Sequence, residues 1–170
     1  QSFVQDFRLP SETEWEYASR GGLDNNPYPW GGPYIRNSRG CFLSNFKPLR
    51  GRYMEDGGMH TVKTSSYHPN DFGLYCMSGN VAEWCRTAYD ESMYEYSHDM
   101  NTEYIYHALD HDPPSMKRKV IRGGSWKDIG YYLQNGSRSY EYQDTAKSYI
   151  GFRSVMNYLG RGGPNKEGDF

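Results

Sequence analysis

Residues 121–139, IRGGSWKDIGYYLQNGSRS, place two consecutive glycines directly after a β-favouring run. The run Lys119–Arg122 predicts a strand, and Gly123 and Gly124 allow the backbone to approach a neighbouring group closely. The residues after Trp126 are rich in Tyr, Asn and Ser, and they include no obvious nucleophile, redox group or metal ligand. We therefore expect a strand whose end enters a cleft, followed by a segment without evident chemistry of its own.

A second local signal is RLPSETEWEYASRGG, residues 8–22. Ser11 is a favourable N-cap, and Glu14 three residues later completes a capping box. The pair Gly21–Gly22 is typical of a helix C-terminus. This stretch predicts a short helix of about nine residues, stabilised by the packing of Trp15 rather than by propensity alone.

The rest of the chain combines short strands with long loops. Residues 23–70 are mostly loop, with a short strand expected at 60–64. NDFGLYCMSGNVAEW, residues 70–84, is typical of turn, strand, turn and strand, and a last strand is expected over 150–156. The predicted fold class is therefore α+β, rich in loops, with short strands and few helices.

The composition limits the class of protein. The chain has 170 residues, a formal net charge of −2 and a pI near 6.2, so we expect no general attraction to nucleic acid or to anionic membranes. This length fits one domain, which we place at residues 1–160, followed by a flexible tail at 161–170. No run approaches the roughly 20 apolar residues of a membrane-spanning helix.

The three cysteines, Cys41, Cys76 and Cys85, leave at least one thiol unpaired because their number is odd. There is no CxxC motif. Two interpretations stay open. The thiols are buried and inert, as free cysteines commonly are, or Cys76 and Cys85 form a disulfide.

Five stretches of the chain, in this order, resemble the formylglycine-generating enzyme, or sulfatase-modifying-factor, domain. They are RLPSETEWEYASRGG, YPWGG, NDFGLYCMSGNVAEW, VIRGGSW and IGFRSV, between Arg8 and Val155. The resemblance implies the loop-rich α+β fold of that family, which is related to C-type-lectin-like domains. It also implies that this chain covers roughly the C-terminal two-thirds of a family domain.

Active members of that family oxidise a substrate cysteine with two cysteines that follow the GGSW motif and bind copper between them. Alignment on Gly123–Trp126 places these two positions at Asp128 and Leu133, and no cysteine occurs in residues 127–170. Thiolates select Cu(I) and form the redox pair. The expectation is therefore a pseudoenzyme without catalytic residues or enzymatic activity. An oxidase with a displaced redox pair is the alternative, which the missing cysteines disfavour.

Four blocks resemble more specifically the GldK/PorK lipoproteins of gliding motility and type IX secretion in Bacteroidetes. They are SNFKPLRG, TAYDES, KRKVIRGGSWKDIGYYLQ and EYQDTAKSYIGFR. This finer resemblance implies a structural subunit of a protein-transport ring at the periplasmic face of the outer membrane. The implied partners are a GldN/PorN-type subunit and further copies of the same chain. Membrane attachment is expected only through a lipid anchor upstream of this chain.

The family resemblance also implies two structural calcium sites. The first maps onto Asn45 and Asp56 and onto the backbone carbonyls of Phe46 and Gly58. Oxygen ligands of this kind suit calcium, with water completing its coordination. The alternative is that Asn45 and Asp56 hydrogen-bond to amides of their own turns, as Asx side chains often do.

The second calcium site maps onto Gly79, Val81 and Glu83. Its fourth position, usually Asp or Asn in the family, is Cys76 in this chain. A thiol is a poor calcium ligand, so this site is damaged. In the alternative interpretation, Asn80 and Glu83 hold the loop by hydrogen bonds to backbone amides.

Two further segments allow more than one interpretation. His107 and His111 have the spacing of metal ligands on a helix, with Asp110 between them, but Pro113–Pro114 follows at once and favours a solvated loop. Residues 86–118 are rich in tyrosine, which is typical of protein interfaces but also fits a self-packed surface loop. We leave the two readings of residues 86–118 open.

A third class of function is a lectin-like module that binds a ligand in the cleft around Trp126, Asp128 and Tyr131. A pull-down with outer-membrane and periplasmic proteins would separate this module from a ring subunit. A copper titration with a peptide oxidation assay would separate both from an oxidase.

Overall fold

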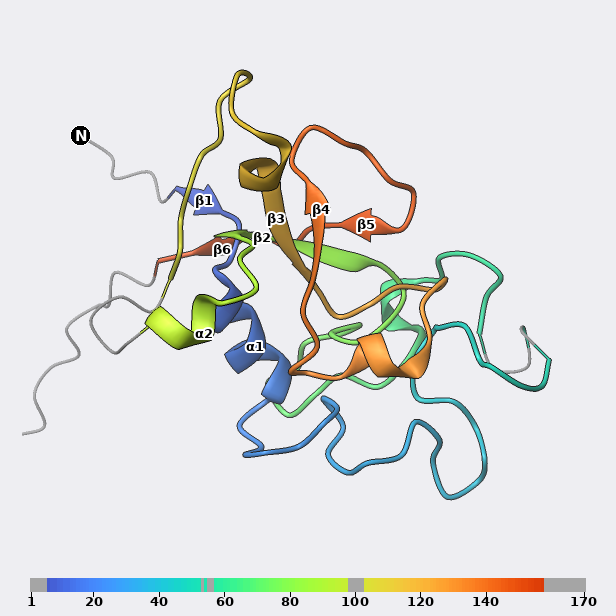
Figure 1. The fold of residues 1–170 in the computed structure, drawn as a ribbon. Coiled ribbons are helices and arrows are strands. Elements are labelled where there is room, and N and C mark those ends of the chain that lie inside the picture. The colour runs from blue at the N-terminus through green and yellow to red at the C-terminus, as the bar shows by residue number, and fades with distance from the viewer. Residues whose placement is uncertain (1–5, 53, 55–56, 98–102, 158–170) are drawn as a thin grey trace, which may run out of the picture.

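The computed structural model describes residues 6–52, 54, 57–97 and 103–157, which form a loop-rich α+β domain around a small mixed sheet (Figure 1). The predicted fold class is confirmed. The described elements, including three 3-10 turns (η), are β1 (Phe7–Arg8), α1 (Glu12–Arg20), η1 (Thr64–Ser66), β2 (Ala82–Ala88), α2 (Met93–Tyr96), η2 (Pro114–Lys117), β3 (Arg118–Arg122), η3 (Gly130–Leu133), β4 (Ser139–Tyr142), β5 (Ile150–Gly151) and β6 (Val155–Met156).

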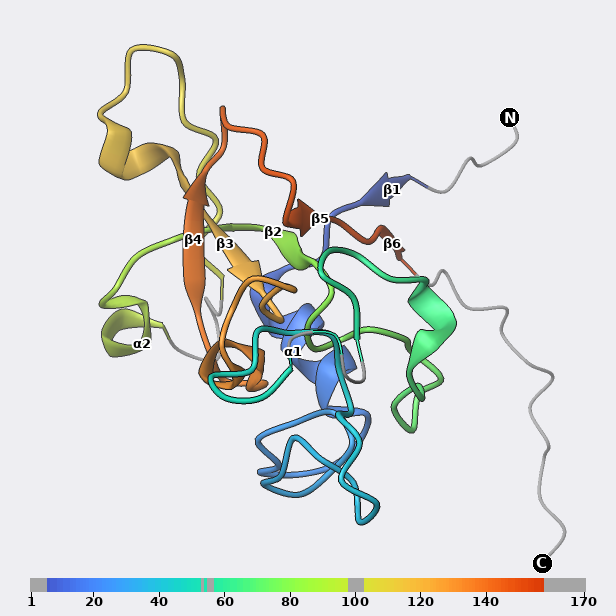
Figure 2. The same ribbon diagram turned by 90° about the vertical axis from the view of Figure 1, so that its right-hand side faces the viewer.

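Four strands form the main sheet in the order β4-β3-β2-β5. The strand β2 runs antiparallel to β3 and parallel to β5. A separate ribbon pairs β1 with β6, so segments from the two ends of the described chain lie side by side (Figures 1 and 2). The single strand expected over 150–156 is therefore wrong. It is divided between the two sheets because residues 152–154 carry the chain from one sheet to the other.

The helix α1 begins and ends where the sequence predicts. The Ser11 hydroxyl accepts a hydrogen bond from the Glu14 N–H at 3.2 Å, and the Glu14 carboxylate accepts one from the Ser11 N–H at 2.9 Å. Gly21 ends the helix in the left-handed conformation, with φ of 61°. Hydrogen bonds from Arg8 to the Glu14 carboxylate hold the pKa of Glu14 at about 2. The capping box is thus complete and charged at neutral pH.

The main core lies between α1 and one face of the sheet. Trp15 is its largest member, with only 1% of its surface exposed. It packs with Met77, Cys85 of β2 and Val120 of β3. Because the helix is short and polar on its other side, this burial is the main favourable term that holds it on the sheet.

A second core holds the long loops in place. It consists of Tyr28, Phe46 and Leu133, and the ring of Trp30 stacks on that of Tyr28 with centroids 4.9 Å apart. The Tyr28 hydroxyl donates to the Gly130 carbonyl at 3.1 Å, which joins two loops distant in sequence. Aromatic side chains therefore replace regular structure as the anchors of this half of the domain.

The strand expected at 60–64 is wrong, whereas the loop character of residues 23–70 is confirmed. Residues 61–63 have no regular structure, and η1 follows them. The backbone N–H and carbonyl of Val62 both bond to the side chain of Asn80, at 2.8 and 3.3 Å. A side-chain amide therefore takes the place of the neighbouring strand that the sequence pattern suggests.

All three thiols are free, so a disulfide between Cys76 and Cys85 is not formed. The expected burial holds for Cys85 alone, since Cys76 is half-buried and Cys41 is exposed. Burial raises the pKa of the Cys85 thiol well above its usual range. Among the described helices, none is long and apolar enough to cross a membrane. The tail predicted at 161–170 lies outside the described residues.

Removal of the N-cap tests the capping box. Ser11→Ala should lower the free energy of unfolding by about 1 kcal/mol, because the Glu14 N–H loses its acceptor in a buried position. Thr13→Ala, an exposed position in the same turn, is the matched control and should change it by less than about 0.5 kcal/mol. Urea denaturation followed by circular dichroism measures both, and equal midpoints would contradict a stabilising cap.

Candidate functional site

The two consecutive glycines singled out in the sequence follow β3 directly. Gly123 and Gly124 have φ values of 86° and 66°. A Cβ on Gly123 would lie 2.9 Å from the Met77 carbonyl oxygen, and one on Gly124 would lie 2.9 Å from the Tyr132 carbonyl oxygen. Both positions therefore require glycine, for conformation and for space. The predicted close approach is confirmed, and the group approached is the protein's own backbone.

Asp128 and Leu133, which the sequence resemblance aligns with the family's thiols, both have structural partners. The Asp128 carboxylate accepts hydrogen bonds from the N–H of Ser125, at 3.0 Å, and from the hydroxyl of Ser125. The Asp128 carbonyl accepts a further bond from the Lys47 N–H at 2.8 Å. Leu133 is fully buried in the second core. Asp128 therefore closes a turn, and Leu133 fills part of the second core.

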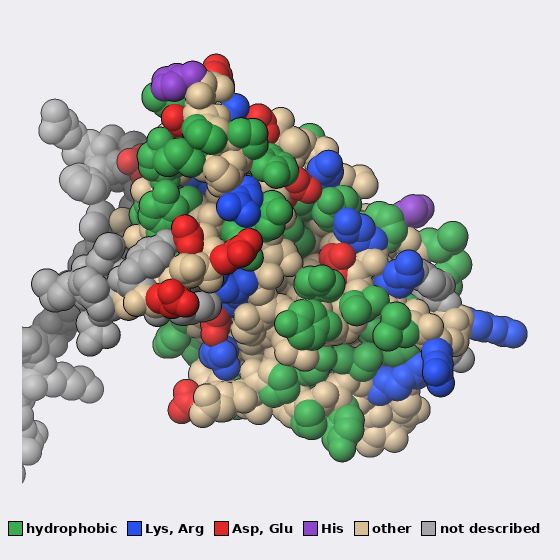
Figure 3. All heavy atoms as spheres, viewed as in Figure 1, with side chains coloured by type: hydrophobic (Ala, Val, Ile, Leu, Met, Phe, Trp, Pro, Cys, Tyr) green, Lys and Arg blue, Asp and Glu red, His purple; other side chains and the backbone are tan. Residues whose placement is uncertain are grey.

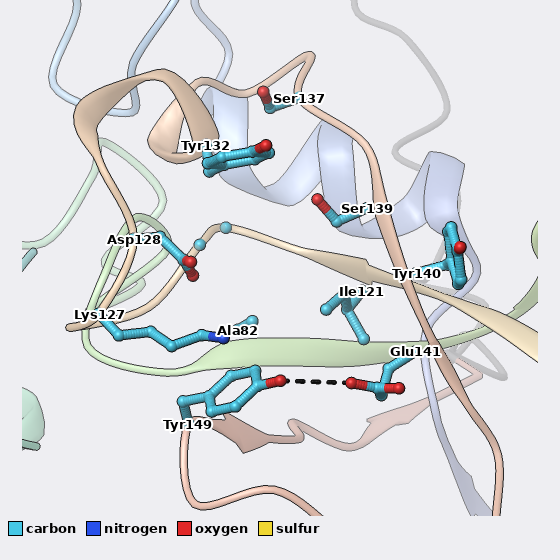
Figure 4. Close-up of a pocket in the computed structure, with 12 residues that line it drawn as sticks. Ala82, Ile121, Lys127, Asp128, Tyr132, Ser137, Ser139, Tyr140, Glu141 and Tyr149 are labelled. Carbon is cyan, nitrogen blue, oxygen red and sulfur yellow. Dashed lines mark hydrogen bonds between the residues drawn. The ribbon is translucent and has the colours of Figure 1, made fainter. Parts of the chain in front are cut away.

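A cavity of about 240 Å³ lies beside this turn, on the side of the sheet away from α1 (Figure 4). The Tyr149 hydroxyl donates to the Glu141 carboxylate at 3.3 Å, and the Lys127 ammonium lies 3.4 Å from the centre of the Tyr149 ring. These groups suit the binding of a polar ligand through hydrogen bonds. The lining residues are Ala82, Ile121, Gly123, Gly124, Lys127, Asp128, Tyr132, Ser137, Ser139, Tyr140, Glu141 and Tyr149.

The structure brings only part of the expected ligand-binding cleft to this cavity. Of the three expected residues, Asp128 lines it. Trp126 instead packs edge-on against His60, with ring centroids 4.8 Å apart, and the Tyr131 side chain is 63% exposed. The sequence patterns do not point to Lys127, Glu141 or Tyr149. Alternation along β4 is the only signal for Glu141, since it places that residue on the face shared with Ser139.

Hydrogen bonds from Gly79 and Asn80 to other loops hold the loop that precedes β2 in place. Asn80 has a φ of 69°, and its N–H donates to the Asn45 carbonyl at 2.8 Å. Gly79 donates to the Gly123 carbonyl at 2.8 Å, so this loop is bonded directly to the glycine turn. Together with the bonds to Val62, these contacts show Asn80 holding the loop as the hydrogen-bonding alternative predicts. That alternative is wrong for Glu83, whose carboxylate bonds to side chains rather than to backbone amides.

Glu83 is the buried acid of this region. Its carboxylate accepts bonds from the Trp15 indole N–H at 2.7 Å and from the Arg153 Nε and Nη2 at 2.6 and 2.7 Å. A cation at the second predicted calcium site would compete with Arg153 for the only carboxylate of the set. Cys76 adds a thiol that donates to the Thr64 carbonyl, and burial raises its pKa. The set Gly79, Val81 and Glu83 therefore fits calcium poorly in this arrangement.

The first predicted calcium site is described only in part, because Asp56 lies outside the described residues. The Asn45 side chain accepts a hydrogen bond from the Gly58 N–H at 3.1 Å and donates one to the His60 carbonyl at 2.7 Å. The Phe46 side chain belongs to the second core. Asn45 and Gly58 thus lie at one loop junction, as a shared site requires, and calcium there stays a prediction.

No cluster of three or more His, Cys, Asp or Glu side chains that could hold a metal ion occurs within the described ranges. His111 lies 3.9 Å from Asp112 and is largely exposed. Of the tyrosine-rich segment 86–118, residues 98–102 lie outside the described part. Tyr89 packs on Tyr140 and Tyr104 stacks on Tyr106, so these tyrosines contact neighbouring rings. Both interpretations of the segment stay open.

Comparison with known proteins identifies the family. A family model described as "Sulfatase-modifying factor enzyme 1-like domain" matches residues 2–158. The chain belongs to this family. The formylglycine-generating enzyme of Streptomyces coelicolor is 33% identical over 150 residues, covering 86% of this chain and 45% of that protein. The formylglycine-generating enzyme of Mus musculus is 32% identical over 165 residues, covering 89% of this chain and 40% of that protein.

Solved structures agree on the sulfatase-modifying-factor fold. PvdO from Pseudomonas aeruginosa superposes with a TM-score of 0.69 at 23% identity, over 91% of this chain and 54% of that one. CarF superposes with a TM-score of 0.60 at 28% identity, over 89% of this chain and 48% of that one. The chain spans less than half the length of the two formylglycine-generating enzymes named above.

These relatives correct the expectation that the chain is not an enzyme. The proteins of S. coelicolor and M. musculus are named formylglycine-generating enzymes, so the chain falls in an enzyme family. The same family includes a protein of Bos taurus named inactive C-alpha-formylglycine-generating enzyme 2, 34% identical over 152 residues. The expectation rested on two aligned side-chain positions in one turn, whereas the family match covers residues 2–158.

Breaking the Glu83–Arg153 pair tests its role in this sulfatase-modifying-factor domain. Glu83→Gln should lower the free energy of unfolding by about 3 kcal/mol, because it leaves a half-buried guanidinium without its counter-charge. Asp144→Asn, which removes the exposed partner of Lys117, is the control and should cost less than about 1 kcal/mol. Chemical denaturation of both variants gives the comparison. Similar losses for the two would contradict a special contribution from Glu83.

Proposed function

We propose that this domain is an assembly subunit of a type IX secretion and gliding-motility ring at the periplasmic face of the outer membrane. Its partners in the proposal are a GldN/PorN-type subunit and further copies of the same chain. A lipid anchor upstream of the chain would attach it to the membrane. The proposal rests on the finer sequence resemblance, and one structural observation supports it.

That observation is the exposure of large apolar side chains in the blocks that carry the finer resemblance. Leu49, in SNFKPLRG, is 80% exposed, and Tyr131, in KDIGYYLQ, is 63% exposed. The two loops are joined by the hydrogen bond from the Lys47 N–H to the Asp128 carbonyl. The fold does not bury Leu49 or Tyr131, whereas a partner surface would gain by covering them.

Substitution of these two residues tests the ring contact. The double variant Leu49→Ser with Tyr131→Ser should keep the fold and weaken association with the co-expressed GldN/PorN-type partner by at least about tenfold, since interface energy is concentrated in a few anchors. Tyr17→Ser is the matched control, because Tyr17 is 68% exposed but lies in the general family motif. Size-exclusion chromatography with cross-linking measures assembly.

Unchanged rings in the double variant would contradict this contact. The segment around Ile105 and Leu109, exposed by 42% and 59%, would then be the next surface to change. That segment belongs to the tyrosine-rich region for which the sequence already suggests an interface.

We further propose structural calcium at the first site, formed by Asn45, Asp56 and the carbonyls of Phe46 and Gly58. Hard oxygen ligands from two loops would fix the junction at which Asn45 already bonds to Gly58 and His60. The ion would act on stability, because a ligand that binds only the folded state stabilises it by mass action.

Chelation tests this site. Treatment with a chelator should lower the Tm, and added calcium should restore it, with a stabilisation of about 2.7 kcal/mol when free calcium is about 100 times its Kd. Asp56→Ala should abolish the response, whereas Glu83→Ala should leave a response to calcium even though it destabilises the fold. A melting curve of the wild-type chain that chelator does not alter would rule out a stabilising ion.

A further inference from the structure

The main sheet has an outer face that α1 does not cover. In β2, Glu83 and Cys85 point toward the helix side, where they contact Trp15. Side chains alternate along a strand, so Trp84 and Arg86 belong to the outer face. Trp84 pairs with Ile121 of β3 in register, which places Ile121 and Lys119 on that same face.

A hollow of about 310 Å³ lies on this outer face and shares no lining residue with the cavity beside the glycine turn. Leu9 and Trp84 supply apolar surface, and Lys119 supplies an ammonium group. In the space-filling view, hydrophobic side chains gather near the top of the molecule, which the tip of the loop between α2 and β3 reaches (Figures 1 and 3). The lining residues are Leu9, Trp84, Cys85, Arg86, His107, Lys119 and Gln143.

The charged groups that line this hollow are cationic, and Lys119 among them has no acidic partner. No carboxylate lines the hollow. The Lys119 ammonium donates only to the backbone carbonyls of Arg86 and Tyr106, and no acidic side chain within the described ranges lies within ion-pair distance of it. Lys117, two residues away, has Asp144 at 3.7 Å. Burial lowers the pKa of Lys119, as expected for a cation without a counter-ion.

Arg86 adds a second cationic side chain to the lining, with an acidic partner that does not line the hollow. Its Nη2 pairs with Glu103 at 2.8 Å, but its Nε is buried and has no hydrogen-bond partner. Beside it, the half-buried indole of Trp84 makes no hydrogen bond with any described residue. A hollow with apolar walls, a half-buried cation and no carboxylate in its lining is complementary to an anion carried on an apolar body.

We propose that this hollow binds a small amphiphilic carboxylate, with its anionic head at Lys119 and its acyl or aryl body against Leu9 and Trp84. A free carboxylate fits better than a peptide terminus. The hollow lies on the face of a sheet, where backbone groups already have partners, as the Arg86 N–H has in the Pro10 carbonyl, and cannot bond to a peptide backbone. Such a site is independent of ring assembly and of the calcium site.

Octanoate is the probe, with octanamide and octylamine as matched ligands that remove or reverse the charge. Titration followed by ¹H–¹⁵N NMR should shift the Trp84 indole N–H with a Kd of about 1 mM for octanoate. The Trp15 indole N–H, which is bonded to buried Glu83, should not move. Octanamide should bind at least about tenfold more weakly, since a hydrogen bond to a charged group is lost. Equal binding of octanoate and octanamide would overturn the proposal.

Substitution of the ammonium locates the head group. Lys119→Met keeps the apolar stem and should weaken octanoate binding by at least about tenfold while leaving octanamide binding nearly unchanged. Lys117→Met is the control and should bind octanoate like the wild type. A peptide acid such as acetyl-Ala-Leu should bind more weakly than octanoate. Tighter binding of the peptide acid, or an unaltered Kd in Lys119→Met, would contradict the assignment.

Discussion

The carboxylate of Glu83 is the buried charge on which three parts of the fold converge. It lies in β2, accepts a hydrogen bond from Trp15 of α1, and pairs with Arg153 in the segment between β5 and β6. A buried carboxylate is costly unless charge and hydrogen bonds compensate it, and here three N–H groups do so. The arrangement that satisfies Glu83 therefore also fixes α1 on the sheet and directs the chain from one sheet to the other after Gly151.

Local signals in the sequence predict those parts of the fold that depend on local contacts. The capping box of Ser11 and the glycine turn after β3 are both found where expected, because each depends on residues only a few positions apart. The Glu83–Arg153 pair joins residues 70 positions apart, and the sequence pattern of neither segment predicts it. For the same reason the expected strand over 150–156 divides in two, and an amide of Asn80 replaces a strand near Val62.

The two faces of the main sheet have different constraints. The face toward α1 is close-packed around Trp15. The choice of side chains there is limited by the available volume and by the hydrogen bonds that the Glu83 carboxylate accepts. The outer face carries two separate hollows that differ in charge, since Lys127, Asp128 and Glu141 line one, whereas the other has cationic side chains and no carboxylate. The contacts of side chains on this face are hard to predict from the sequence. Alternation along a strand assigns a side chain to a face but does not show which groups it contacts there.

The turn after β3 keeps its shape in this chain without thiols at Asp128 and Leu133. Its shape depends on two glycines without room for a Cβ and on backbone bonds to Gly79 and Asn80. Asp128 needs only to accept bonds from Ser125, and Leu133 needs only to fill the core beside Phe46. In this chain the backbone of the turn is therefore held by the glycines and by backbone bonds, and it requires no thiol at Asp128 or Leu133. The family motifs therefore indicate the fold, whereas function has to be inferred from the side chains that line each hollow.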